Sequence, residues 1–185
     1  NVAVCFGTDT VATSAGGALY VLPIDLTTDG AFQVGGGPHK ESIRKLAQIT
    51  DGTSHTVLAS EVLSGKVDIR LPPRHIWDAR GLWAWGTMGA HCYTHRNTPN
   101  SSAGDAMWAN FGQDVGCTDM PDMPCDNTHG TQHDEFHAAA RSRHPGGVNA
   151  VFADGHVIFA SNTIDLVIWQ RLASIADGQV IPWDF

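Results

Sequence analysis

Apolar residues predominate at positions 148–160 on both sides of a central Asp154-Gly155 pair. An Asp-Gly pair tolerates the positive φ angles that a two-residue type I′ turn needs, so this segment predicts a β-hairpin. With that turn Phe152 would pair with Val157, and both faces of the hairpin would be apolar. A hairpin of this kind is covered on both sides, so we expect it at or near the centre of an antiparallel sheet.

A helical pattern follows the hairpin. Apolar residues recur there at helical spacing, at Ile164, Ile168, Leu172 and Ile175. This spacing forms one apolar stripe on a helix, and Gly178 is a typical stop beyond its end. We therefore expect a C-terminal helix over about residues 164–176, packed on the hairpin.

Shorter apolar runs between turn-forming residues predict strands earlier in the chain, over about residues 2–6, 18–22, 57–63 and 67–71. Residues 86–137 are the least regular part, with many Asn, Asp and Pro residues. A loop of that length is either functional or held by cross-links. Together these elements predict an α+β fold in a single domain of 185 residues, with long loops.

Charge and hydropathy narrow the classes of partner. The net charge of −8 disfavours nucleic acid and anionic membrane surfaces, which attract basic proteins. The sequence contains no apolar run of about 18 residues, so we expect no membrane span in this chain. The chain starts at Asn1 without a signal-peptide pattern, which indicates a processed or truncated start of a soluble domain.

Four cysteines are present, and no two of them form a Cys-x-x-Cys pair. This pattern argues against a zinc ribbon or a thioredoxin-like redox site. An even number of cysteines in an exported protein favours two disulfides, with thiols or metal ligation as alternatives. Of the three pairings we prefer Cys117 with Cys125, across a short Pro-rich loop, and Cys5 with Cys92.

Several short segments are weak alone and specific in combination. They are His144-Pro145-Gly146-Gly147, Asp154-Gly155, Asp51-Gly52 with Glu61 downstream, and Thr98-Pro99-Asn100-Ser101. Nine residues separate His144 from Asp154. In these segments the chain resembles a large bacterial family of pilin-like secreted proteins, described as a prepilin-type processing-associated domain or as a solute-binding-like protein of unknown function. The family usually has Asn where this chain has His55.

The resemblance covers most of the chain from Cys5 onward and implies a pilin-like fold. Members of the family normally begin with a processing site and a long apolar helix that completes one face of the sheet. This chain starts without either, so we expect the soluble part of such a protein, with apolar surface on that face exposed or covered by a partner. The resemblance implies a secreted or cell-surface location and supplies no catalytic residue.

A histidine and an aspartate invite a catalytic dyad, but their spacing argues against one. If the segment between them is extended, His144 and Asp154 lie roughly 25–30 Å apart, at about 3.3 Å per residue. We interpret Asp154 as a turn residue and expect His144 to bond the start of the helix, with Asp165 as one partner. Glu61 lies within a predicted strand, and we expect it to bond the loop at residues 51–56.

Tryptophans are the candidates for binding a glycan or a small solute, although aromatic residues at this spacing are more often part of a core. They are Trp77, Trp83, Trp85 and Trp108.

Two further groups are candidates for metal ions. His129, His133 and His137 are four residues apart, which on a helix would bring imidazoles to one transition-metal ion, yet Gly130 weakens a helix there. An oxygen-rich loop without EF-hand spacing offers calcium the carboxylates of Asp119, Asp122 and Asp126. The resemblance implies no firm cofactor.

The function that we expect is non-enzymatic. It is a secreted or cell-surface pilin-like subunit with a structural, adhesive or secretion-associated role, which self-associates or joins a pilus-type or secretion-type assembly. One alternative is a solute- or glycan-binding module that uses the tryptophans. The other is a metal-binding protein or metal-dependent hydrolase that uses the His129, His133 and His137 cluster.

Overall fold

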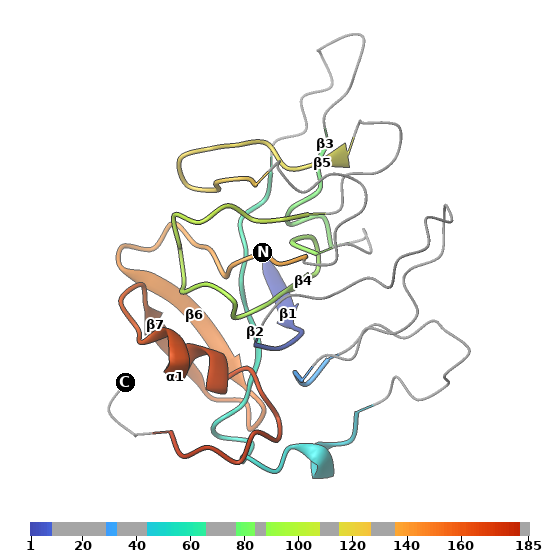
Figure 1. The fold of residues 1–185 in the computed structure, drawn as a ribbon, viewed down its shortest axis with the longest axis vertical. Helices are drawn as coiled ribbons and strands as arrows, with labels where there is room; N and C mark the ends of the chain where they lie inside the picture. Colours follow the sequence, from blue (N-terminus) through green and yellow to red (C-terminus); the bar gives the residue numbers. More distant parts are fainter. Residues whose placement is uncertain are drawn as a thin grey trace, which may run out of the picture.

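The computed structural model describes residues 1–8, 29–32, 44–65, 77–83, 88–107, 115–126 and 136–181. Its main sheet has five strands in the order β4-β1-β2-β6-β7 (Figure 1). These strands are β1 Val2–Cys5, β2 Val57–Glu61, β4 Cys92–Tyr93, β6 Gly147–Phe152 and β7 Val157–Ser161. A two-stranded sheet pairs β3 (Trp77–Asp78) with β5 (Val115–Gly116), and the helices are the 3-10 helix η1 (Leu46–Gln48) and α1 (Leu166–Arg171).

The main sheet is mixed. β4 runs parallel to β1, with Val4 opposite Cys92, whereas the other neighbouring strands are antiparallel. The α+β class is confirmed, but the expectation of a purely antiparallel sheet is wrong at this edge. Only antiparallel neighbours can be joined by a tight turn, and β4 reaches β1 through a connection that includes β2 and β3.

The β6–β7 hairpin forms where the sequence predicts it, but its register differs by one residue. Val151 pairs with Val157, and the Gly155 N–H donates to the Phe152 carbonyl at 2.9 Å. Gly155 has a φ of 91°, whereas Asp154 is not among the residues with positive φ. The turn is therefore a three-residue loop that ends in a glycine bulge, and the predicted type I′ pair is wrong.

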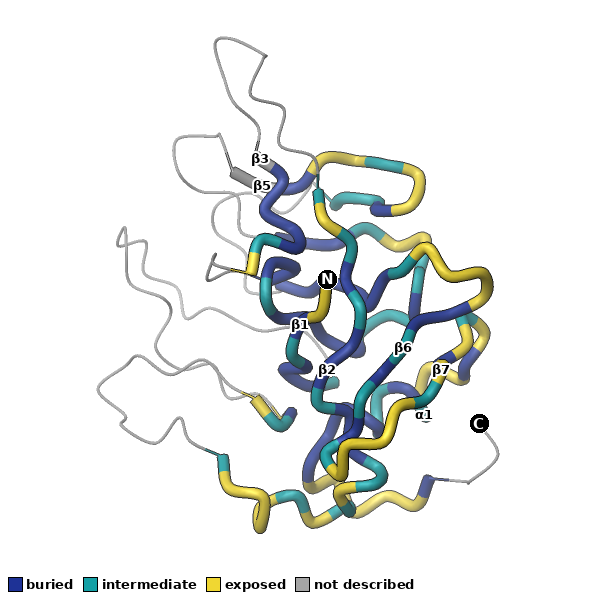
Figure 2. The backbone as a smooth tube through the Cα atoms, turned by 180° about the vertical axis from the view of Figure 1, so that it is seen from behind, coloured by how far each residue is buried: buried dark blue, intermediate teal, exposed yellow. Residues whose placement is uncertain are grey.

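Because side chains alternate across a strand, this shift changes which residues share a face. Ala150 and Phe152 are buried in the main core, whereas Val157 and Phe159 lie on the opposite face and are 59% and 51% exposed. β7 is an edge strand with exposed residues along it (Figure 2). The prediction of a hairpin at the centre of the sheet, covered on both sides, is wrong for β7.

α1 is shorter than the predicted helix. It begins after Asp165, whose carboxylate accepts the N–H groups of Val167 and Ile168 at 2.8 and 3.1 Å. Beyond Arg171 the backbone bonds other segments. The Leu172 carbonyl accepts the Val57 N–H at 2.7 Å, and the Ile175 carbonyl accepts the Thr50 N–H at 2.8 Å. These tertiary bonds replace the remaining turn of the expected helix.

The main core lies between the sheet and α1, which crosses one face of β6 and β7 (Figure 1). Trp169 from α1 is fully buried there and stacks on the imidazole of His95, with ring centroids 3.6 Å apart. His95 lies between the Tyr93 hydroxyl and the Trp169 carbonyl, and burial lowers its pKa to about 3.

Within the described residues, none of the helices has the length and hydropathy to cross a membrane.

Candidate functional site

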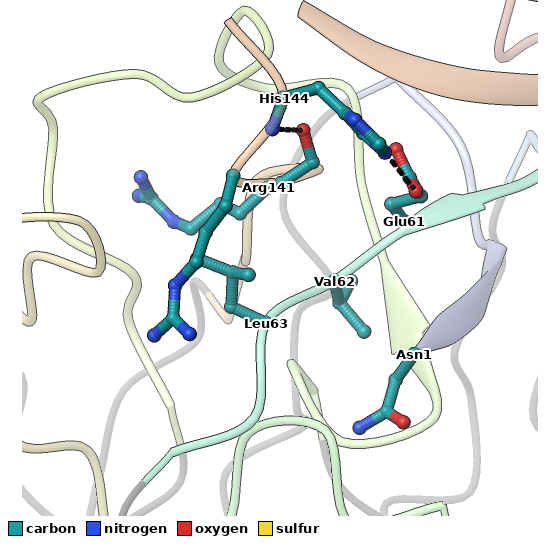
Figure 3. Close-up of a pocket in the computed structure, with 8 residues that line it drawn as sticks. Asn1, Glu61, Val62, Leu63, Arg141 and His144 are labelled. Carbon is teal, nitrogen blue, oxygen red and sulfur yellow. Dashed lines mark hydrogen bonds and ion pairs between the residues drawn. The ribbon is translucent and has the colours of Figure 1, made fainter.

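Two of the segments that carry the family resemblance, those with Glu61 and His144, meet at the end of β2, around the carboxylate of Glu61. Its Oε2 accepts the backbone N–H of Asn149 at 2.8 Å and the side-chain amide of Asn149 at 3.2 Å. Its Oε1 lies 3.1 Å from Nε2 of His144. Figure 3 marks this contact with a dashed line. β6 places Asn149 beside β2, and the turn before β6 returns His144 over the same carboxylate. We call these three residues the Glu61 cluster.

The Glu61 cluster holds its carboxylate in the charged form. Partial burial works to raise the pKa of Glu61, but the hydrogen bonds from Asn149 and His144 outweigh it, so the pKa is lowered. The His144 side chain is 53% exposed, so its contact with Glu61 is worth about 0–1 kcal/mol even when the imidazole is charged. Most of the order in the cluster therefore comes from the two bonds of Asn149.

A surface cleft of about 310 Å³ adjoins the cluster. It is lined by Asn1, Glu61, Val62, Leu63, Arg141, Ser142, Arg143 and His144 (Figure 3). The Ser142 hydroxyl donates to the Gly147 carbonyl at 2.7 Å and accepts the backbone N–H of His144 at 3.1 Å. A nucleophilic serine needs a hydrogen bond to the basic side chain, and this hydroxyl bonds the backbone. The residues at the cleft therefore connect the end of β2 to the turn before β6.

The structure places His144 and Asp154 at opposite ends of β6 and gives each a partner of its own. The Asp154 carboxylate accepts the His156 backbone N–H at 3.1 Å and also bonds its imidazole. The backbone bond from His156 is the largest cause that lowers the pKa of Asp154. Asp165, the partner that we expected for His144, caps α1 instead.

The Asp51-Gly52 segment also takes a structural position, and it does not contact Glu61 as expected. The Asp51 carboxylate accepts the backbone N–H groups of Asp177 and Gly178 at 2.6 and 2.9 Å. Gly52 has a φ of 102°, a conformation that favours glycine. This segment therefore anchors the chain that follows α1.

Asn100 links the chain at the base of the hairpin, a role that we did not predict. It has a φ of 52°, in the left-handed region where asparagine is enriched. Its side chain accepts the Ser142 N–H at 2.8 Å and donates to the Gly147 carbonyl at 3.3 Å and the Asn162 side chain at 2.8 Å. The Pro99-Asn100 pair favours a turn, and this is the sequence signal that could have indicated the role of Asn100.

The tryptophan candidates are only partly described. Trp83 is 83% exposed, and Trp77 lies in β3. Trp85 and Trp108 lie outside the described residues.

The metal candidates are not brought together where the structure describes them. His129 and His133 lie outside the described residues, and Nε2 of His137 lies 3.2 Å from the Gly104 carbonyl. Asp119 accepts the Cys125 N–H at 3.1 Å, Asp122 pairs with Arg143 at 3.2 Å, and Asp126 bonds Asp105 through its backbone. Across the described ranges no group of three or more His, Cys, Asp or Glu residues could hold an ion.

One predicted disulfide is confirmed and the other is wrong. Cys117 and Cys125 are joined, with their Cα atoms 5.7 Å apart. Cys5 and Cys92 are buried thiols, and burial raises the pKa of each to about 12. Cys92 is the partner of Val4 in the parallel pairing of β1 and β4, so it projects on the face opposite to Cys5. Adjacent strands thus hold the two sulfur atoms apart.

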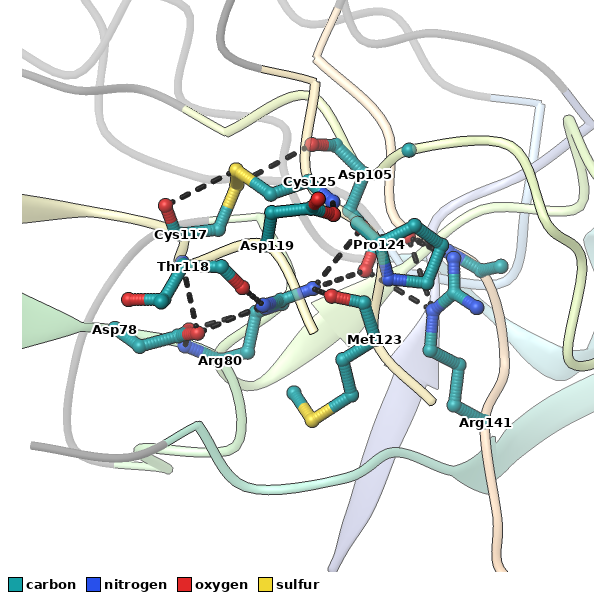
Figure 4. Close-up of polar contacts among 12 residues, drawn as sticks. Asp78, Arg80, Asp105, Cys117, Thr118, Asp119, Met123, Pro124, Cys125 and Arg141 are labelled. Atoms are coloured by element: carbon teal, nitrogen blue, oxygen red, sulfur yellow. Dashed lines mark hydrogen bonds and ion pairs between the residues drawn. A yellow bond between two sulfur atoms is a disulfide. The ribbon is translucent and has the colours of Figure 1, made fainter. Parts of the chain in front are cut away.

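A buried charge network is the main feature that sequence reasoning missed. Arg80 donates to the carboxylate of Asp78 through Nε and Nη2, at 3.0 and 2.7 Å, and through Nη1 to Asp105 at 3.0 Å (Figure 4). Arg141 donates to the same Asp105 carboxylate at 2.9 Å. All four side chains are buried. Scattered charges in loop sequence carry no periodic signal that would have brought them together.

The network also binds the backbone of the ring that the Cys117–Cys125 disulfide closes. Arg80 donates to the backbone carbonyls of Thr118, Met123 and Pro124, at 2.7, 2.8 and 3.2 Å (Figure 4). Burial works to lower the pKa of Arg80, but the hydrogen bonds and charges of Asp78 and Asp105 outweigh it and raise the pKa. The guanidinium therefore stays charged and joins the ring to β3.

The chain matches no curated protein and no solved structure. Residues 11–167 match one protein family, and this match spans the Glu61 cluster, the hairpin and the disulfide ring. The chain therefore belongs to the family SBP_bac_10, described as a protein of unknown function (DUF1559).

Proposed function

We propose that the protein is a non-enzymatic, pilin-like subunit of an assembly outside the cytoplasm. The observation that carries this proposal is the open face of the main sheet. Val2, Glu61, Asn149 and Phe159 form a row across β1, β2, β6 and β7 on the face opposite to the main core. Val2 and Phe159 are exposed at the two ends of this row, and Val157 is exposed beside it. Val157 and Phe159 lie on the same side of β7, and neighbouring exposed apolar residues of this kind are typical of an interaction site.

The family-like residues support a structural role. Glu61 and His144 join β2 to the turn before β6, Asn100 ties the base of the hairpin, and Asp51 anchors the chain after α1. Each acts through hydrogen bonds to backbone or to a neighbouring side chain. A catalytic site would need a reactive group with a base or an ion beside it.

The disulfide supports a location outside the cytoplasm, because such bonds persist in oxidising compartments. The ring that it closes holds the buried charge of Arg80, so a reducing environment would weaken the fold. Secretion or display at the cell surface is therefore part of the proposal.

Sedimentation velocity over a range of protein concentrations tests the proposal. We expect reversible self-association, since a subunit must contact copies of itself. A chain that stays monomeric up to about 1 mM, where even an interaction of about −4 kcal/mol would be half formed, contradicts it. As a control for loss of fold stability, Asp51→Asn should lower the melting temperature and leave the association intact, because Asp51 anchors the chain after α1 and is not part of this row.

Trp83 favours a second candidate function, the binding of a glycan or small solute. Its indole is 83% exposed, and an exposed indole face stacks well on a sugar ring. Quenching or a shift of tryptophan fluorescence on titration with oligosaccharides, lost in Trp83→Ala, would support this function. An unchanged spectrum across neutral and charged oligosaccharides would contradict it.

A further inference from the structure

The outer edge of β7 carries a row of backbone groups without partners among the described residues. At the two ends of the β6–β7 ladder the Phe152 N–H donates to the His156 carbonyl, and the Asn162 N–H donates to the Gly146 carbonyl. In an antiparallel pair every second residue bonds its neighbour, so the even-numbered residues of β7 bond β6. The N–H and C=O groups of Val157, Phe159 and Ser161 therefore point away from the sheet. Only the Ser161 carbonyl takes a described partner there, the Ile164 N–H at 3.1 Å.

Two of these residues, Val157 and Phe159, also expose apolar side chains. Val157 and Phe159 project from the open face, and Phe159 places its ring edge-on to the imidazole of His144, with centroids 6.4 Å apart. Natural proteins usually protect an edge strand with a charge, a proline or a covering loop. β7 has the sequence Val-Ile-Phe-Ala-Ser and contains neither a charged residue nor a proline.

The charge distribution favours a second copy of the chain as the partner. The net charge of −8 makes two copies repel over most of their surfaces. No charged residue occurs in residues 145–153 or in residues 157–164, so the hairpin strands form a neutral patch on an acidic protein. A basic partner would be drawn to the acidic surface elsewhere, whereas a like-charged copy can approach closely at this edge.

We infer that two copies pair edge to edge through β7, antiparallel about a twofold axis at Phe159. This inference rests on the proposed function, because it takes self-association as given and assigns its contact. At the axis Phe159 would exchange two hydrogen bonds with Phe159 of the second copy, and Val157 would pair with its Ser161. The two phenylalanine rings would then meet on the open face as a cross-strand aromatic pair. The result is one continuous sheet through both molecules.

Hydrogen exchange measured residue by residue tests the backbone contact. In the free chain the amides of Val157, Phe159 and Ser161 should exchange rapidly, whereas those of Ile158 and Ala160 are protected by β6. Raising the protein concentration should protect the first three amides at least about tenfold, because edge pairing buries them. Protection that does not change with concentration at these amides, in a protein that does associate, overturns the inference.

Charge pairing tests the axis. Phe159→Lys places two lysines opposite each other and Phe159→Glu places two glutamates, so each variant alone should associate at least about tenfold more weakly than wild type. An equimolar mixture of the two should recover heterodimers, because lysine then faces glutamate. Val180→Lys is the matched control, since Val180 is equally apolar, 85% exposed and distant from β7 in sequence. Protected amides of Ile158 and Ala160 show that each variant is folded.

The outcomes separate the two proposals. Wild-type association that neither Phe159 variant weakens refutes the β7 contact and leaves the proposed subunit role standing. A wild-type chain that stays monomeric up to about 1 mM refutes both. Variants that associate weakly alone and together, with no recovery in the mixture, refute the twofold axis at Phe159.

Discussion

Replacing Arg80 with methionine removes a guanidinium that lies between two buried carboxylates. Arg80 is 2% exposed and bonds Asp78 and Asp105. Its remaining donors hold backbone carbonyls of the disulfide ring. Methionine approximates the length of the side chain but leaves Asp78 buried without its counter-charge, whereas Asp105 keeps Arg141. The variant therefore isolates the effect of one uncompensated buried carboxylate.

We expect the variant to lose about 3–5 kcal/mol of unfolding free energy, because a buried charge that loses its partner stays desolvated. That is a large part of the total of about 5–15 kcal/mol that is typical of a domain. Arg143→Met is the matched control. Arg143 also pairs with an aspartate of the disulfide ring, Asp122, but the two side chains are 74% and 45% exposed. Removing that ion pair should cost about 0–1 kcal/mol.

Urea unfolding, followed by tryptophan fluorescence, measures the free energy of unfolding for the wild type and both variants. A loss below about 1 kcal/mol in Arg80→Met, or equal losses in the two variants, would refute the assignment of this network as a main support of the fold. The double variant Asp78→Asn/Arg80→Met should recover part of the loss, since it also removes the stranded charge. A double variant no more stable than Arg80→Met would show that the cost lies in packing.

Three further predictions concern stability. Replacing Cys117 and Cys125 with serine should cost about 2.5 kcal/mol in urea unfolding from the entropy of the small loop alone, and an unchanged midpoint would contradict this. Lowering the pH from 7 to 5 should reduce the free energy of unfolding by about 2 kcal/mol through His95. The pKa of His95 is about 3 in the folded protein and near 6.5 in the unfolded chain, so only the unfolded chain takes up the proton in this range. The stability that neutral His95 contributes is fully present above the unfolded pKa and is lost as the pH falls towards 3. In His95→Gln this part of the pH dependence should be absent. Gly147→Ala should cost about 1–3 kcal/mol, because the added Cβ would lie 2.2 Å from the Ala160 carbonyl oxygen, and a melting temperature equal to that of wild type would contradict this.

The parts of the fold that sequence could predict are those set by local chemistry. An apolar run around Asp154-Gly155 was enough for a hairpin, and a short Pro-rich spacing was enough for the Cys117–Cys125 disulfide. The register was not predictable in the same way, because Asp-Gly fits both a two-residue turn and a three-residue turn with a glycine bulge. Choosing the wrong turn moved Val157 and Phe159 from a covered face to an exposed one.

The site was harder to predict, because its contacts join segments that are far apart in the chain. Glu61 and His144 were both identified as residues of the family-like segments, yet their contact spans 83 positions. From the sequence we assigned Glu61 to the nearby loop at residues 51–56, and His144 to the start of the helix that the hairpin brings back, with Asp165 as one partner. The pairing of β2 with β6 determines the actual partner of Glu61, because it brings Glu61 opposite Asn149.

The Glu61 cluster and the exposed edge are parts of one surface. The pairings of β1 with β2 and of β6 with β7 place Glu61, Asn149 and Phe159 in one row on the open face. Gly147 leaves the room in which the Phe159 ring lies, because a Cβ there would approach the ring to 2.8 Å. The family-like residues at the start of β6 thus position the side chain that is central to the proposed contact. Residues that would be read as a catalytic motif from their chemical types alone act together here to shape the edge at which we propose the contact.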